Sequence, residues 1–221
     1  GKLDLLAILS QIKMITMKRV LLIFFCLPLI SFGQFLPKTT NGSDIKQLND
    51  GGYILAKTSS SFKSYAFIST TLGSLEKRDS NGNYVWNREL LTPSSGLSKA
   101  SSVQICDDGG FIVAGTSTFK NTTSDASLSK IDRDGNIIWV KSFGFGNSNF
   151  DKANSVQICD DGGFIVAGVS DNKAYLFKTD MNGNLIWENK FSMEGPYRET
   201  ANSVQICKDG GFIVAGTAKY N

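Results

Sequence analysis

One stretch of fourteen residues recurs in this chain and constrains its fold more than any other feature. The sequence SVQICDDGGFIVAG occupies 155–168, an identical copy occupies 102–115, and a copy with one change occupies 203–216. A shorter version, DGGYILAK, occupies 50–57. Internal similarity of this kind is typical of repeat architectures, in which each unit packs against its neighbours along the chain.

A second motif follows the first three of these stretches. Its pattern is Leu-x-Lys-x-Asp-x-x-Gly-Asn-x-x-Trp, and it occupies 75–86, 128–139 and 176–187. Successive Asp-Gly-Gly turns are 58, 53 and 48 residues apart, which lies in the range of propeller repeats. The segment between the two motifs accounts for this variation, because it measures 18, 13 and 8 residues. We therefore expect one loop per repeat that is free to vary.

Each unit is expected to form four β-strands, which in the third unit are predicted at 156–159, 164–167, 175–179 and 185–191. The glycines of the Asp-Gly-Gly turn supply the positive φ that a tight hairpin needs. The second strand is apolar at consecutive positions, so both of its faces should be covered, whereas a β-sandwich would show alternation. The predicted fold class is therefore all-β: a β-propeller of four-stranded antiparallel blades, with about three and a half blades present.

These units resemble the secreted β-propeller repeats of Bacteroidetes-type bacteria, whose consensus joins a DGG(Y/F)IVAG run to a D-x-x-GN-x-x-W segment. The resemblance covers about 43–217. More distantly, 132–139 is similar to the tryptophan-docking motif of quinoprotein-type propellers, in which a Trp of each blade packs against its neighbour. The first repeat departs from the pattern, with Lys57 in place of the Gly and Leu48 in place of the Cys. The residues expected to pack between blades are Trp86, Trp139 and Trp187.

The segment 17–33 has the pattern of a secretory signal peptide. Two cations precede an apolar run of about 13 residues, and small residues stand before a cleavage site between Gly33 and Gln34. Such a run is too short to span a bilayer, and a buried helix or a lipoprotein signal using Cys26 fits the flanking residues less well. The predicted divisions are 1–16, upstream translation outside the fold; 17–33, signal peptide; 34–42, linker; and 43–221, propeller repeats (about 43–100, 101–153, 154–201 and a partial 202–221).

Charge and composition exclude several classes of function. After residue 33 the chain has 19 basic and 19 acidic residues, so there is no electrostatic footprint for nucleic acid or for an anionic membrane. Histidine is absent, which removes Ser-His-Asp and Cys-His catalytic systems and His-ligated metals. We expect no catalytic residue, no cofactor and no metal in this chain, and no membrane span after cleavage of the leader.

Three cysteines occupy equivalent positions in successive repeats. They cannot all pair within the chain, and no Cys-x-x-Cys spacing suggests a metal site. We interpret them as small buried apolar residues that pack within the blades rather than as disulfides. The three positions are Cys106, Cys159 and Cys207.

Two groups of acidic residues suggest cation sites, although a turn explains them better. The segments 132–136 and 180–184 are similar to the opening of calcium loops, but no late bidentate Glu follows. Asp, Asn and Gly are also the residues that a tight turn prefers. Asp160 and Asp161 are a weaker candidate, because Lys208 replaces the first acid in the next repeat.

The segments that do not repeat are where a binding site is expected. In an antiparallel blade the variable loop and the connection to the next blade lie on the same face, opposite the two tight turns. Loops held on a rigid scaffold commonly carry function. The candidate ligand-binding residues on this face are Phe119, Phe145, Asp151, Tyr197, Arg198 and Glu199, with Phe62 and Tyr65 in the first repeat.

Two functional hypotheses follow from these observations. The first is an exported, non-enzymatic propeller module, secreted or on the cell surface, that binds a glycan or a protein or serves a structural role. The alternative is the N-terminal part of a propeller enzyme, quinoprotein-like or glycan-acting, whose catalytic residues lie beyond residue 221. Fold class alone does not decide between them.

The blade count leads to an expectation about stability. Propellers close with four to eight blades, and an open set leaves strand edges and a blade face in water. We therefore expect this chain to be a C-terminally truncated part of a longer protein. A sharp, monomeric, cooperative melt of a recombinant protein spanning 34–221 would contradict this expectation.

Overall fold

A computed structural model describes residues 41–63, 68–90, 98–119, 123–144, 150–192 and 197–220, and the predicted leader lies outside these ranges. The described residues form strands and no helix, so none of them builds a helix able to cross a membrane. The strands are β1 (Asn41–Gln47), β2 (Tyr53–Lys63), β3 (Ile68–Arg78), β4 (Tyr84–Glu89), β5 (Lys99–Ile105), β6 (Phe111–Phe119), β7 (Thr123–Ile131), β8 (Ile137–Phe143), β9 (Lys152–Ile158), β10 (Phe164–Ser170), β11 (Lys173–Thr179), β12 (Leu185–Phe191), β13 (Tyr197–Ile206) and β14 (Phe212–Tyr220).

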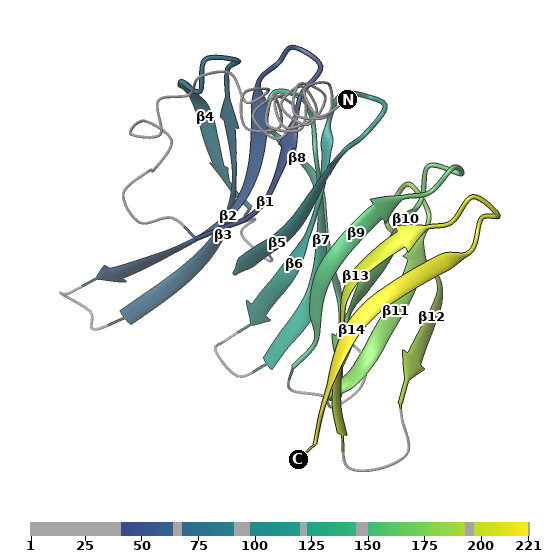
Figure 1. Cartoon of the computed structure of the whole chain (residues 1–221). Coiled ribbons are helices and arrows are strands. Elements are labelled where there is room, and N and C mark those ends of the chain that lie inside the picture. The colour runs from purple at the N-terminus through teal and green to yellow at the C-terminus, as the bar shows by residue number, and fades with distance from the viewer. Residues whose placement is uncertain are drawn as a thin grey trace, which may run out of the picture. The chain divides into compact units, whose positions relative to one another are not determined.

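The strands form antiparallel sheets in chain order, as Figure 1 shows. Three sheets have four strands each, β1–β4, β5–β8 and β9–β12, and β13 pairs with β14 in a further sheet. The first strands of successive sheets contact one another, since β5 touches both β1 and β9, and β9 touches β13. This arrangement confirms the predicted all-β class of four-stranded antiparallel propeller blades.

The consecutive apolar residues of the second strand are explained by two separate cores. Phe111 and Val113 belong to a buried cluster shared with the first blade, whereas Ile112 and Ala114 belong to a cluster shared with the third blade. Because successive side chains of a strand point to opposite faces, the same strand contributes to both. The prediction that both faces are covered is therefore confirmed for β6, and β10 repeats the arrangement.

Each tryptophan contacts the phenylalanine that follows the Gly-Gly pair of the next blade. The ring centroids of Trp86 and Phe111 are 6.3 Å apart, and those of Trp139 and Phe164 are 6.2 Å apart. Gly183 lies against Trp139, since a Cβ atom at Gly183 would stand 2.7 Å from Cη2 of this tryptophan. Gly183 also has a φ of 73°, so this position requires glycine for both reasons.

The variable segment is a β-hairpin of changing length, and this corrects the expectation of a free loop. Strands β2 and β3 pair as far as Lys63 and Ile68, whereas β10 and β11 are joined by only two residues, Asp171 and Asn172. Both of these residues have positive φ, as a two-residue hairpin turn requires. The backbone of the longer segments continues the ladder, because added residues can extend two paired strands without disturbing the blade.

A matched pair of glycines provides a test of this packing. A Cβ atom added at Gly163 would stand 2.3 Å from the Thr179 carbonyl oxygen, whereas at Gly211 it would meet only the Asp209 side chain, at 3.1 Å. We predict that Gly163→Ala lowers the free energy of unfolding by about 1–3 kcal/mol, because the third strand must move away. Gly211→Ala should change it by less than about 0.5 kcal/mol.

Urea denaturation followed by tryptophan fluorescence measures both effects, since Trp139 contacts Phe164 beside Gly163 and Trp187 contacts Phe212 beside Gly211. Equal destabilisation by the two substitutions would show that the close carbonyl is not the cause.

Candidate functional site

A pair of acidic residues lies on the face that carries the variable hairpins. Asp151 precedes β9 and is only 1% exposed, and its backbone N–H donates to the Ser124 carbonyl at 2.7 Å. Phe150 forms a parallel bridge with Ser124 in the preceding blade. These two backbone contacts hold the inter-blade connection against β7, and they place Asp151 beside the hairpin that carries Asp125.

The carboxyl group of Asp125 lies in a partly enclosed position. Asp125 is on β7 opposite Ser117, and Gly144 closes one side, because a Cβ atom at Gly144 would stand 2.6 Å from Oδ1 of Asp125. Burial raises the pKa of Asp125, and the negative charge of Asp151 raises that pKa further. The Asp125 carboxyl group therefore holds its proton to a higher pH than an ordinary aspartate.

Serine hydroxyl groups lie on the strands around Asp125. Ser117 Oγ is 3.0 Å from Ser142 Oγ, which is 3.2 Å from Ser127 Oγ. Ser127 in turn donates to the Lys141 carbonyl at 3.1 Å. Ser117 and Ser127 are buried and Ser142 is exposed, so Ser142 is the hydroxyl group of this network that can donate to or accept from a neutral polar ligand.

The charge of Asp151 also acts on the third blade. Tyr175 is fully buried, and its hydroxyl group donates to the Glu188 carboxylate. Burial raises the pKa of Tyr175, the hydrogen bond from its hydroxyl to Glu188 adds to this, and the charges of Glu188 and Asp151 raise it further. The charge of Asp151 therefore acts on both Asp125 and Tyr175.

Glu199 occupies the position in the fourth repeat that Asp151 occupies in the third. Its backbone N–H donates to the Asn172 carbonyl of the preceding blade at 2.7 Å, and its side chain is 5% exposed. The sequence placed both acids in the connections between blades, and in the structure Asp151 is buried just before β9 and Glu199 is buried within β13. The hydrogen bond to the neighbouring blade holds each of them against that blade.

The other candidate residues do not join this pair. Tyr197 is half-buried in β13 with its ring centroid 5.5 Å from that of Tyr220, and Arg198 is exposed in the same strand. Phe119 and Phe62 lie near the ends of β6 and β2. Phe145 and Tyr65 lie outside the described residues.

The acidic turns use their carboxylates internally. Asp132 Oδ1 accepts the backbone N–H groups of Asp134 and Asn136, at 2.9 and 2.8 Å, and Oδ2 accepts the Asn136 side chain at 2.8 Å. These hydrogen bonds, led by that of the Asn136 side chain, lower the pKa of Asp132. Asp161 accepts from Gly163 and pairs with Lys178. Within the described ranges, no group of three potential ligands could hold a metal ion.

The three repeated cysteines are free thiols. Cys106 and Cys159 are buried and Cys207 is half-buried. Burial raises the pKa of both Cys106 and Cys159, which keeps the thiols protonated and poorly reactive.

Comparison with known proteins gives structural neighbours and no family. The chain matches no model of a protein family and no curated protein. It is similar in structure to the periplasmic gluconolactonase of Pseudomonas aeruginosa, at 11% identity and a TM-score of 0.47, over 83% of this chain and 68% of the other. It is also similar to a second protein assigned as a gluconolactonase, at 11% identity and a TM-score of 0.41, over 83% and 78% of the two chains.

These neighbours are named as enzymes, and the finding contradicts the expectation of a non-enzymatic module, which we withdraw. At 11% identity the likeness shows the fold alone.

The coupling between the two aspartates can be measured directly. We predict that Asp151→Asn lowers the pKa of Asp125, because it removes the neighbouring charge and leaves the burial in place. Titration of the Asp125 carboxyl carbon by NMR measures this shift. The exposed Asp134 provides the control, since Asp134→Asn should leave the Asp125 titration unchanged.

The same shift predicts how stability depends on pH. The folded-state pKa of Asp125 lies above its ordinary value of 3.8, so the folded state binds more protons between these two values. The free energy of unfolding therefore falls as the pH rises through this window, by less than about 1 kcal/mol because the carboxyl group is partly in water. Asp125→Asn should remove this part of the pH dependence, and an unchanged pH profile would contradict the assignment.

Proposed function

We propose that this chain supplies blades to an exported β-propeller enzyme that acts on a carbohydrate, with Asp125 as the group that transfers a proton. The observation that carries the proposal is the placement of Asp125 beside Asp151, on the face formed by the variable hairpins and the inter-blade connections. Carboxyl groups that act as general acids commonly have a second carboxylate or an apolar wall close by, which keeps them protonated near neutral pH.

The two carboxyl groups differ in exposure, and this assigns them different roles. Asp151 is almost fully buried and acts through its charge and its position, whereas Asp125 is partly exposed and can contact a ligand. A protonated Asp125 can donate to the oxygen of a leaving group, and the ionised form can take a proton from an attacking water. In this proposal Asp151 is a positioning residue that tunes Asp125.

The serine network supports a hydroxylated substrate. Ser117 lies opposite Asp125 in the paired strand, and its hydroxyl group meets that of Ser142. Ser142 is exposed, whereas Ser117 is buried, so Ser142 can exchange this hydrogen bond for one to a sugar hydroxyl without leaving a charge unpaired. The predicted leader at 17–33 and the resemblance to secreted propeller repeats support a location outside the cytoplasm, where glycans are accessible to the protein.

Kinetic assays of the Asp125→Asn and Asp151→Asn variants test the proposal. The substrates are a panel of aryl glycosides and sugar lactones, assayed with the 221-residue chain from pH 4 to 8. We predict that Asp125→Asn lowers kcat/KM on the active substrate by about 10²–10⁴-fold, the usual contribution of a general acid or base. Asp151→Asn should retain more activity and move the pH limb that belongs to Asp125 to lower pH.

Asp134→Asn is the matched control, because Asp134 is an exposed aspartate in the turn between β7 and β8. Circular dichroism of each variant confirms that it folds. The proposal fails if Asp125→Asn retains full activity on every substrate that the parent chain converts, or if no substrate in the panel is converted.

A further inference from the structure

The strand β14 begins with the same five residues as its equivalents but has a different environment. Its Phe-Ile-Val-Ala-Gly run matches that of β6 and β10, each of which pairs with a strand on both sides. Within the described residues, β14 pairs only with β13. Ile213 is 63% exposed, whereas its equivalent in β10, Ile165, is fully buried. The outer edge of β14 therefore presents unpaired backbone groups, and Ile213 is uncovered on the sheet face that the following blade covers in β10.

A carboxylate beside this edge lacks the cation that its equivalents have. The aspartate of each earlier Asp-Gly-Gly turn pairs with the lysine of the third strand. The distance is 3.7 Å for Asp50 and Lys77, and 2.7 Å for Asp108 and Lys130, and Asp161 pairs with Lys178 in the same way. Among the described residues, Asp209 meets no lysine and accepts only the Gly211 N–H, at 2.9 Å.

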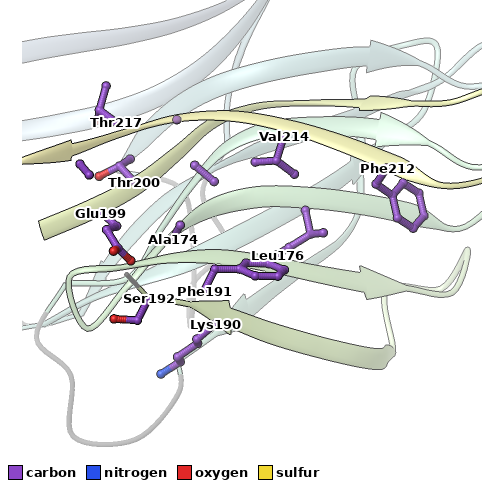
Figure 2. Close-up of a pocket in the computed structure, with 13 residues that line it drawn as sticks. Ala174, Leu176, Lys190, Phe191, Ser192, Glu199, Thr200, Phe212, Val214 and Thr217 are labelled. Atoms are coloured by element: carbon purple, nitrogen blue, oxygen red, sulfur yellow. The ribbon is translucent and has the colours of Figure 1, made fainter. Parts of the chain in front are cut away.

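An apolar groove adjoins the same edge, and Figure 2 shows the side chains that line it. The groove has a volume of about 820 Å³ and lies between β11 and β12 on one side and β13 and β14 on the other. Phe191 is 50% exposed there. Its equivalent in the second blade, Phe143, is buried against Phe177 of the next blade's third strand, with the ring centroids 4.7 Å apart. The residues that decide the chemistry of the groove are Leu176, Phe191, Phe212 and Val214.

We propose that the β14 edge and this groove bind a β-hairpin of the Leu-x-Lys-x-Asp-x-x-Gly-Asn-x-x-Trp type, with an aromatic residue directly before the lysine. The register follows from the earlier blades, where the lysine pairs with the isoleucine and the leucine pairs with the alanine of the central strand. The incoming lysine therefore lies opposite Ile213, within reach of Asp209. The aromatic residue lies opposite Val214 and packs on Phe191, because alternate residues of a strand share a face.

Strand addition to an open edge is a common way to bind an extended segment. Backbone hydrogen bonds supply affinity and side-chain pockets supply specificity. Here the specificity comes from one charge and one aromatic ring, so a segment with an acid in place of the lysine is rejected by Asp209. The inference is independent of the proposed enzymatic function, since it uses neither Asp125 nor Asp151.

Binding of a synthetic peptide tests the proposal. The probe has the sequence of residues 173–191, which carries the aromatic residue and the lysine at the required positions, and fluorescence anisotropy measures its binding to the 221-residue chain. We expect saturable binding with one peptide per chain. The K178E change in the peptide should weaken binding about tenfold. This effect is a little larger than that of losing one exposed ion pair, because the new glutamate also repels Asp209. Asp209→Lys in the protein should restore binding of the K178E peptide.

A second variant separates binding from folding. Gly211→Ala adds a Cβ atom where the carbonyl of the incoming strand must lie, by analogy with Gly163 and the Thr179 carbonyl oxygen. This variant should keep the stability of the parent chain and lose at least tenfold in peptide affinity. Asp134→Asn is the control and should bind the peptide as the parent does.

Three results would overturn the proposal. The first is the absence of saturable binding by the parent peptide. The second is equal affinity for the parent and K178E peptides, which would indicate non-specific apolar adsorption. The third is self-association of the chain in sedimentation experiments that excess peptide does not reverse, which would make a second copy the occupant of the groove.

Discussion

The fold depends on burial of both faces of the second strand of each blade. Phe111 and Val113 pack toward one neighbouring blade, and Ile112 and Ala114 pack toward the other. A single blade therefore cannot bury its own apolar residues, because half of them belong to a core that the next blade completes. The tryptophan of the fourth strand adds to the same interface, since it reaches the phenylalanine of the following blade. Stability in this protein is a property of adjacent pairs of blades.

In the first blade, charged residues occupy the sheet face that is turned away from the second blade. Lys57 stands where the second and third blades have glycine, and it is buried in an ion pair with Glu76. Arg78 also contacts this carboxylate, at 2.6 Å, and donates to the Gly82 carbonyl at 2.8 Å. Ile54 and Ala56 face the second blade, so these charged groups lie on the opposite face of the sheet. The second blade has Gly115, Ser129 and Ile131 at the positions of these three paired charges, whereas β14 keeps the Phe-Ile-Val-Ala-Gly run of the repeat.

The sequence predicted the scaffold better than the site. The motifs predicted the strand at 185–191 with its observed bounds and predicted 164–167, which is the first part of the observed β10 (Phe164–Ser170), because turns with Asp and Gly have strict backbone requirements. It did not predict that Asp151 and Glu199 are buried, since their exposure depends on hydrogen bonds to the backbone of the preceding blade. Asp125 was missed as well. It lies in a variable segment with no motif, and its partner is brought beside it only by the stacking of blades.

The burial of Asp151 and Glu199 explains how a strict repeat can still carry different chemistry. Each residue donates its backbone N–H to a carbonyl of the preceding blade at 2.7 Å, so the backbone fixes the position whatever the side chain is. The second blade has Ser98 at the equivalent place, where the backbone N–H donates to Thr116 of the same blade instead. Core packing limits which residue types fit at the apolar positions, and the backbone conformation of the turns requires glycine at the glycine positions. The acid at this position changes from Asp151 to Glu199 between repeats while the backbone hydrogen bond to the preceding blade stays the same, and in the third repeat this bond holds Asp151 next to Asp125.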